Sequence, residues 1–329
     1  MVVNTWAFTK ATARAWDVLS SSKSAVDAVE QGCSLCEEQQ CDFTVGFGGS
    51  PGEDSETTLD ALIMEGTNMD AGAVSDLRHV KHAIGTARLV MEHTNHTMLA
   101  GLQATAFAVE MGMKLANLST PASSDMYYRW QNNNCQPNFR RRVSPDPRKH
   151  CGPYKKVDTN EQSELAGRQL LDASGMQLPG HSSLWVGPEN HDTISMVAID
   201  KDGNVAAGSS SNGANHKVPG RVGDASVPGG GAYADSEVGG CGSTGDGDLH
   251  MRFLPCYQVV ESMRQGMHPT EAAEDAVRRI VKRFPGYVGA LFGVDKEGRH
   301  GGAAHGWTFT YAVRDASMSD VELHQIESM

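Results

Sequence analysis

The pattern of apolar and polar residues predicts strands and helices in the first third of the chain. Apolar residues at helical spacing between Ala25 and Leu35 indicate a helix, and the stretch VGFGGSPGEDSETT that follows indicates a Gly-rich loop. In chain order, the expected elements are a strand at 2–6, helices at 9–20 and 23–38, two strands within 58–74 that meet at Gly66, a helix at 76–93 and a strand at 97–101. The pattern then weakens: residues 120–155 are rich in Asn, Pro and Arg, and the polar residues 156–190 predict a mobile linker.

A second group of elements begins at Thr193. The stretch TISMVAID predicts a strand, residues 201–204 predict a hairpin turn, and VAAGSSS predicts the returning strand. The elements expected after it are a Gly-rich stretch at 220–247, helices at about 248–265 and 269–284, and final strands that turn at Glu297-Gly298 and near Gly306. Because strands and helices lie on both sides of the linker, two antiparallel sheets with helices on their outer faces are expected.

The composition excludes several classes of protein. A length of 329 residues suits one large domain or two small ones. No run of about 18 apolar residues occurs, so no membrane partner is expected. The net charge of −12 argues against a nucleic-acid partner, since phosphate binding needs clustered Lys and Arg. The one basic cluster, Arg140-Arg141-Arg142, is short and is interpreted as a solvated loop.

The seven cysteines leave two interpretations open. Cys33 and Cys36 have the spacing of a redox or zinc motif, but no second such pair or His pair completes a site. Cys36–Cys41 and Cys135–Cys151 could instead close short disulfide loops, which requires an oxidising compartment. Sequons at Asn95 and Asn117 agree with such a compartment. The opening MVVNTWAF is no signal peptide, so either the true N-terminus is trimmed or the protein is cytosolic.

The residues His191-Asp192-Thr193 stand directly before the strand that opens the second group. A Thr hydroxyl is a poor nucleophile without a base, and an N-terminal Thr can use its own α-amine as that base. This amine has a reference pKa of about 7.7–8.0, so a good fraction is neutral near pH 7. Cleavage before Thr193 would release the amine. Asp192 could take the hydroxyl proton during an N→O acyl shift, and water would then split the ester. The alternative is an ordinary Thr at the start of a strand.

Three later segments could complete such a site. The stretch GRVGDASVPGGGAYAD places Arg221 and Asp224 three residues apart, where they could hold the carboxylate and the ammonium of an α-amino acid. The stretch GSTGDGD offers the Thr244 hydroxyl and the Gly245 amide to a developing oxyanion. Ser211 lies across the hairpin, where its hydroxyl could bond to the nucleophile. Taken singly, an ordinary ion pair and a simple turn would explain the first two segments.

Together these motifs resemble the aspartylglucosaminidase, or glycosylasparaginase, family of N-terminal-nucleophile hydrolases. The motifs, in order, are VVNTW, VGFGGSP, NCQPN, CGPY, HDTI, GRVGD, GAYAD, TGDGD and MRFLP. The resemblance implies an α+β fold, a four-layer αββα sandwich in one globular domain. It also implies autoproteolysis at Asp192-Thr193 into an α-chain of residues 1–192 and a β-chain of residues 193–329. The implied reaction cleaves the amide of the small-molecule substrate glycoasparagine, between asparagine and N-acetylglucosamine, and releases aspartate and the glycosylamine.

The resemblance also assigns roles by position. The assigned residues are Thr193 as nucleophile, Ser211 where the family has a supporting Thr, Arg221 and Asp224 for the α-carboxylate and α-amine, Thr244 and Gly245 as the oxyanion hole, and Trp6, Ser50 and Gly247 lining the pocket. A dimer of cleaved α/β units and a lysosomal location complete what the family implies.

Some positions depart from the family pattern. Ser195 replaces the Gly of the usual HDTIGM, and Ser211 keeps the hydroxyl of the Thr that it replaces, so function is expected to survive. Similarity to vertebrate members implies disulfides Cys36–Cys41 and Cys135–Cys151. Those members have two further C-terminal disulfides, whereas this chain has no cysteine after residue 256. Three cysteines are therefore expected as buried free thiols: Cys33, Cys241 and Cys256.

Three rival interpretations remain. Residues 48–52 match the serine-hydrolase motif G-x-S-x-G, but a polar loop and a strand follow where that motif needs a helix. A non-catalytic sugar-binding homologue differs from the enzyme in that its purified chain would stay whole. An asparaginase or isoaspartyl peptidase would share the fold and the Thr nucleophile. The sequence contains neither a metal-ligand cluster nor a phosphate-binding loop, so no cofactor and no metal are expected.

Overall fold

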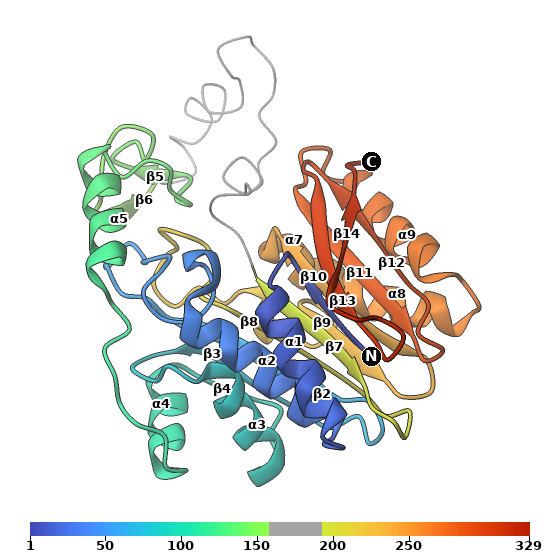
Figure 1. Ribbon diagram of the computed structural model, residues 1–329. Helices are drawn as coiled ribbons and strands as arrows, with labels where there is room; N and C mark the ends of the chain where they lie inside the picture. The colour runs from blue at the N-terminus through green and yellow to red at the C-terminus, as the bar shows by residue number, and fades with distance from the viewer. Residues whose placement is uncertain (158–192) are drawn as a thin grey trace.

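The computed structural model describes residues 1–157 and 193–329, which form a mixed α/β fold (Figure 1). Its larger sheet has eight strands in the order β14-β13-β1-β7-β8-β2-β3-β4, all antiparallel neighbours except the parallel pair β3 and β4. The strands, in that order, are Glu322–Ile326, Phe309–Arg314, Val2–Thr5, Ile194–Ile199, Val205–Ser211, Leu59–Glu65, Ala71–Leu77 and Met98–Ala100. The N-terminal strand β1 thus lies beside β7, the strand that Thr193 precedes.

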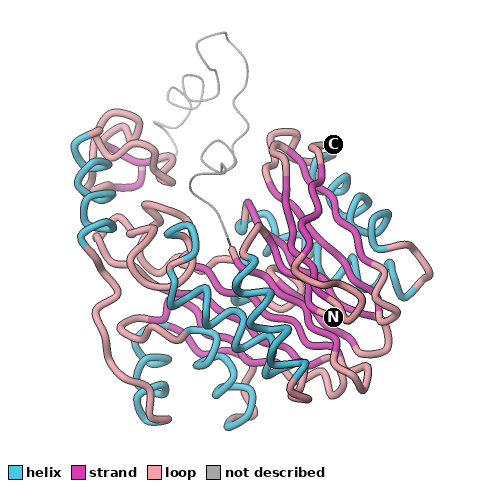
Figure 2. The backbone as a smooth tube through the Cα atoms, in the orientation of Figure 1, coloured by secondary structure: helices cyan, strands magenta, loops and turns pink. Residues whose placement is uncertain are grey.

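The smaller sheet has four antiparallel strands in the order β12-β11-β10-β9. They are His300–His305, Gly289–Asp295, Gly239–Gly245 and Ala232–Asp235. A separate two-stranded ladder, β5 (Val143–Ser144) with β6 (Lys155–Lys156), lies near α5 (Pro121–Asn132), at the side of the molecule away from α8 and α9 (Figure 2).

Three apolar clusters hold the helices and sheets together. The first joins helices α1 to α3 to the larger sheet, the second contains residues of both sheets, and the third joins the smaller sheet to α8 and α9. The helices are α1 (Thr9–Ser20), α2 (Ala25–Gln39), α3 (Ala83–His93), α4 (Gly101–Glu110), α7 (Gly247–Phe253), α8 (Pro255–Arg264) and α9 (Pro269–Val281). In β2, Ala61 and Ile63 belong to the first cluster and Leu62 to the second, so this strand is buried on both faces.

Most predicted elements are confirmed. The helix expected at 9–20 is α1, the two strands expected within 58–74 are β2 and β3, and the hairpin after Thr193 is β7 and β8. In the part of the chain that the structure describes, no helix is long and apolar enough to span a membrane. The linker predicted at 156–190 lies outside the described residues from residue 158 onward.

Two predicted helices need correction, and two stretches for which no element was predicted contain helices or strands. The helix expected at 76–93 begins only at Ala83, because β3 extends to Leu77 and pairs with β2. The Gly-rich stretch 220–247 contains strands β9 and β10, whose small residues let the two sheets approach: a Cβ at Gly240 of β10 would lie 2.7 Å from the Val197 side chain of β7. The helix expected at 248–265 breaks at Leu254, which has φ 49° and precedes a proline. Finally, the weakly patterned residues 120–155 contain α5.

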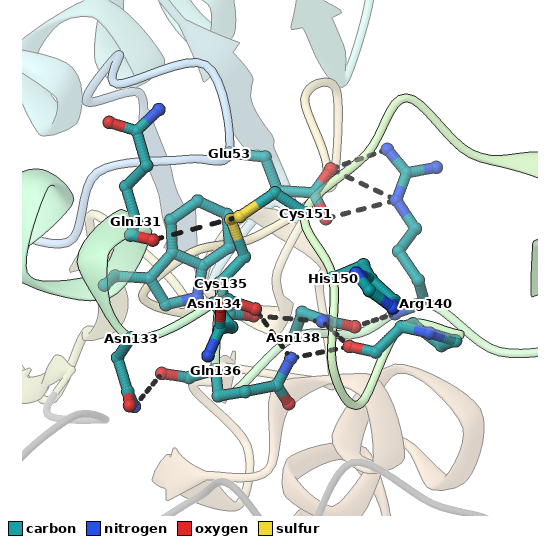
Figure 3. The surroundings of a disulfide bond; sticks show 12 residues. Glu53, Gln131, Asn133, Asn134, Cys135, Gln136, Asn138, Arg140, His150 and Cys151 are labelled. Atoms are coloured by element: carbon teal, nitrogen blue, oxygen red, sulfur yellow. Dashed lines mark hydrogen bonds and ion pairs between the residues drawn. A yellow bond between two sulfur atoms is a disulfide. The ribbon is translucent and has the colours of Figure 1, made fainter. Parts of the chain in front are cut away.

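Both predicted disulfides are present, Cys36–Cys41 and Cys135–Cys151. Beside the second, Asn138 donates to the Cys135 carbonyl at 3.0 Å, and Arg140 pairs with Glu53 through Nε and Nη2 (Figure 3). Arg140 is therefore half-buried in an ion pair, whereas Arg141 and Arg142 are exposed in a loop, as predicted for the cluster. The Arg140–Glu53 pair ties the disulfide loop to the Gly-rich loop that contains Ser50.

The other three cysteines, Cys33, Cys241 and Cys256, are unbonded and buried, as predicted. The thiols of Cys241 and Cys256 contact each other at 2.7 Å. Burial raises the pKa of the Cys241 thiol, which disfavours the reactive thiolate.

Candidate active site

Thr193 is the buried residue directly before the central strand β7, and only 4% of it is exposed. Its amide nitrogen donates to Thr244 Oγ1 at 3.3 Å, and its carbonyl accepts from Thr5 Oγ1 at 2.5 Å. Thr5 Oγ1 also accepts from the Ser195 amide at 2.9 Å. Contacts from both sheets therefore fix the backbone on either side of the Thr193 side chain.

Trp6 joins the same group of residues. Its indole Nε1 donates to Thr244 Oγ1 at 3.1 Å. The indole is held edge-on by Trp307 and Phe309, whose ring centroids lie 5.1 and 5.6 Å away. The structure thus brings together three residues that the sequence analysis placed in the site: Trp6, Thr193 and Thr244.

Ser211 lies opposite Thr193. Strand β7 pairs with β8 so that Ile194 faces Ser210, and Thr193 and Ser211 follow as the next positions of the two strands. In the structure the Ser211 hydroxyl accepts from the Gly213 amide at 2.9 Å. A hydrogen bond from Ser211 to the nucleophile stays a prediction.

Arg221 and Asp224 converge on Gly247. A side chain at Gly247 would put its Cβ 2.4 Å from Asp224 Oδ1 and 3.2 Å from Arg221 Nη2, so this position needs a glycine. Arg221 Nη2 pairs with Asp248 Oδ2 at 3.1 Å, and its buried Nε has no hydrogen-bond partner among the described residues. Burial opposes the charge of Arg221, but Asp248, Asp60 and Asp224 outweigh it and raise the guanidinium pKa. A buried guanidinium group that stays charged is suited to a carboxylate ligand, because it can donate two parallel hydrogen bonds to it.

Gly245 follows Thr244 at the end of β10 and has φ +126°. A Cβ there would lie 2.4 Å from Gly289 Cα, so both the conformation and the space require glycine. Only glycine therefore allows the backbone conformation found directly after Thr244.

A family described as Asparaginase matches residues 1–322. The chain belongs to the asparaginase family.

Three relatives are about half identical to the chain in sequence. It is 52% identical over 327 residues to an Arabidopsis thaliana protein named probable isoaspartyl peptidase/L-asparaginase 3, covering 99% of this chain and 90% of the relative. It is 50% identical over 305 residues to the N(4)-(beta-N-acetylglucosaminyl)-L-asparaginase of Rattus norvegicus, covering 93% and 84%. It is 51% identical over 327 residues to a putative enzyme of the same name from Drosophila melanogaster, covering 97% and 80%. The resemblance found in the sequence is therefore confirmed.

Two further residues predicted for the site are Ser50 and Asp192. Ser50 is buried with φ 35° in the Gly-rich loop, and its neighbour Gly49 packs against Asn212, just beyond β8. This places the Ser50 loop beside the strand that carries Ser211, and its lining of the pocket stays a prediction. Asp192, with the bond before Thr193, lies outside the described residues.

Two buried charged residues of this asparaginase-family chain were missed by the sequence analysis. Asp60 accepts from the amides of Asp76 and Gly223, both at 2.8 Å, and burial raises its pKa. Lys217 is also buried, and desolvation lowers its pKa to about 8 although Asp60 opposes the shift. Asp60 raises the pKa of Arg221, and Arg221 lowers the pKa of Lys217. Asp60 and Lys217 are therefore both close enough to Arg221 to interact with it electrostatically. Neither Asp60 nor Lys217 lies in a sequence motif that indicates a catalytic or binding role.

His250 and Tyr287 were missed as well. His250 Nδ1 lies 2.7 Å from Asp224 Oδ2, and its Nε2 lies 2.6 Å from the Tyr287 hydroxyl. In the sequence, His250 falls within an expected helix and Tyr287 lies near the end of another, so neither pattern suggested a site. Among the described residues, no group of three or more His, Cys, Asp or Glu could hold a metal ion.

Proposed function

We propose that this chain is an amidohydrolase that cleaves N4-(β-N-acetylglucosaminyl)-L-asparagine at its side-chain amide. The observation that carries the proposal is the hydrogen bond from the Thr193 nitrogen to Thr244 Oγ1 at 3.3 Å. It joins the atom that would become the catalytic α-amine to the hydroxyl that we assign to the oxyanion hole. The names of the rat and fruit-fly relatives support this choice of substrate.

Maturation would begin at the Asp192–Thr193 bond. The Thr193 hydroxyl attacks the Asp192 carbonyl carbon, and an N→O acyl shift converts the amide into an ester. Water then hydrolyses the ester, which leaves a carboxylate on Asp192 and a free α-amine on Thr193. The products would be an α-chain of residues 1–192 and a β-chain of residues 193–329. The contact with Thr5 supports the idea that both chains stay together, since it joins the Thr193 carbonyl to the α-chain.

Turnover would use the same hydroxyl a second time. The α-amine takes the hydroxyl proton as Thr193 attacks the side-chain carbonyl carbon of the substrate. The Thr244 hydroxyl and the Gly245 amide would stabilise the negative oxygen that forms. As this intermediate collapses, the α-ammonium returns its proton to the substrate nitrogen, and the glycosylamine leaves. Water then hydrolyses the aspartyl ester and releases aspartate. Ser211 would support the nucleophile from the facing strand.

The amino-acid end of the substrate would bind at Gly247. Arg221, whose buried Nε has no partner among the described residues, is suited to the α-carboxylate. Asp224 would accept from the α-ammonium. Trp6 and Ser50 would line the pocket from the side of the N-terminal strand and the Gly-rich loop.

A second candidate is hydrolysis of isoaspartyl peptides or asparagine. The name of the Arabidopsis relative, which is 52% identical, favours it. Both reactions break an amide at the side-chain carbonyl of an aspartyl unit, so the residues above would serve either one. The groups beyond the amide would decide the preference.

The test is aspartate release from glycoasparagine, from an isoaspartyl dipeptide and from asparagine, each at several concentrations. We expect the highest kcat/KM with glycoasparagine, none after Thr193→Ala, and partial activity in the matched variant Thr193→Ser, which keeps a hydroxyl. A higher kcat/KM for the dipeptide would support the second candidate. A wild-type chain that binds glycoasparagine without hydrolysing it would mean a non-catalytic homologue.

We infer three further properties at the level of the whole protein. The three apolar clusters support a four-layer αββα sandwich of the N-terminal-nucleophile type. Family membership supports a dimer of cleaved α/β units, which sedimentation of the mature protein would test. The two disulfides support an oxidising route, and a degradative substrate supports the lysosome as its destination.

A further inference from the structure

His250 connects a proposed substrate-binding residue to a buried tyrosine. Its side chain is 0% exposed and lies between Asp224 and Tyr287, with a short contact at each ring nitrogen: 2.7 Å from Nδ1 to Asp224 Oδ2, and 2.6 Å from Nε2 to the Tyr287 hydroxyl. The three residues come from different elements: the turn Asp224–Ser226, helix α7 and the loop before β11. The chain of contacts is therefore set by tertiary structure.

The partners determine which ring nitrogen carries a hydrogen. An ionised carboxylate only accepts hydrogen bonds, so His250 Nδ1 must donate to Asp224. In the neutral ring, Nε2 then accepts from the Tyr287 hydroxyl. Burial, together with Asp246 and Asp224, raises the pKa of Tyr287, which keeps the phenol protonated and able to donate. Tyr287 thereby fixes the tautomer and the orientation of the imidazole.

The contact also fixes the rotation of the Asp224 carboxylate. Oδ2 lies 2.7 Å from His250 Nδ1 and 3.3 Å from the Ser243 hydroxyl, whose single hydrogen has a shorter acceptor in the Gly230 carbonyl at 2.8 Å. This rotation turns Oδ1 toward Gly247, where a Cβ would lie only 2.4 Å away. Oδ1 thus faces the same small space as Arg221.

We propose that His250, oriented by Tyr287, is a positioning residue that holds Asp224 so that Oδ1 accepts the α-ammonium of the substrate. This proposal rests on the proposed function, because it assigns Asp224 to the amine. It makes recognition of the amine, rather than the bond-breaking step, depend on His250.

The experiment compares two competitive inhibitors, L-aspartate and succinate, which differ by the α-amine. His250→Leu removes the donor, His250→Asn keeps an N–H near the position of Nδ1, and Tyr287→Phe removes only the hydroxyl. Tyr257→Phe, at a partly exposed tyrosine on α8, is the matched control. Each variant is checked for two-chain maturation and for its unfolding midpoint.

In His250→Leu, we expect KM for glycoasparagine and Ki for aspartate to rise about 10- to 100-fold, as for the loss of a buried hydrogen bond to a charged group. The Ki of succinate and kcat should change less than about threefold. His250→Asn should recover much of the loss, and Tyr287→Phe should fall between the wild type and His250→Leu. Should His250→Leu fail to fold, the other two variants carry the test.

Equal weakening of both inhibitors would show that His250 only packs the site, and unchanged Ki values in all variants would also overturn the proposal. Failure of the proposed function looks different. The wild type would then release no aspartate from glycoasparagine, while calorimetric binding of aspartate and succinate would still report whether His250 reads the amine.

Discussion

The Trp6 indole donates to Thr244 Oγ1 at 3.1 Å, across a separation of 238 residues. The same oxygen accepts from the Thr193 nitrogen at 3.3 Å. Trp6 directly after β1, Thr193 directly before β7 and Thr244 at the end of β10 thus meet at one hydroxyl, from both sides of the proposed cleavage point. In a mature enzyme this hydroxyl would touch the catalytic amine and would be oriented by Trp6.

Trp6→Phe is therefore expected to affect the chemical step. Phenylalanine can keep the edge-on packing against Trp307 and Phe309 but loses the donor to Thr244, so kcat should fall about 3- to 10-fold with a smaller change in KM. Steady-state kinetics of the mature enzyme measure this. Trp307→Phe is the control, because the buried Trp307 nitrogen has no partner among the described residues. Equal losses in both variants would mean that packing, and not the hydrogen bond, matters.

Arg221→Lys should mainly raise KM. Lysine keeps the positive charge but cannot form two parallel hydrogen bonds, and the loss of one to a charged group corresponds to about tenfold or more. Glycoasparagine with an acetylated α-amine and an amidated α-carboxylate should be a poor substrate for the wild type. Arg221→Lys should lower the turnover of this blocked substrate much less than it lowers the turnover of free glycoasparagine. Equal turnover of the free and blocked substrates by the wild type would show that Arg221 and Asp224 do not read the amino-acid end.

The sequence predicts the part of this site that is encoded in short motifs. Thr193, Arg221 and Thr244 each stand in a compact motif whose chemistry is visible without the fold. His250 pairs with residues 26 and 37 positions away, and a burial-dependent contact of that kind leaves no local pattern. The same limit applies to the fold: β10 consists largely of glycine and other small residues, and it becomes a strand because it pairs with β9 and β11 and packs closely against the larger sheet.

His216 should make the folded protein sensitive to acid. Its ring is buried and stacks on Trp130 at 4.8 Å, and burial lowers its pKa from 6.5 to about 4. Between those values the unfolded chain binds a proton that the folded chain does not, so stability present above pH 6.5 is lost as the pH falls toward 4. The loss is at most roughly 3 kcal/mol. His216→Phe keeps a ring on Trp130, and its unfolding midpoint should fall less than that of the wild type between pH 7 and pH 4. Parallel curves for the two proteins would contradict the assignment.

The cysteines should separate into two disulfides and three thiols. After unfolding without reductant, alkylation should label Cys33, Cys241 and Cys256, and peptide mapping should recover Cys36–Cys41 and Cys135–Cys151 as linked pairs. The 2.7 Å contact between Cys241 and Cys256 makes this a sharp test. Recovery of those two cysteines as a linked pair, or of a Cys33–Cys36 bridge, would contradict it.

The most direct test of the central claim is the intact mass of freshly purified protein under denaturing, reducing conditions. If Thr193 is a nucleophile that self-cleavage exposes, the wild type must separate into two masses, those of residues 1–192 and 193–329 when the chain begins as printed. Thr193→Ala must give one undivided mass. A wild-type protein that releases aspartate from glycoasparagine while its mass remains that of one unbroken chain would contradict the account.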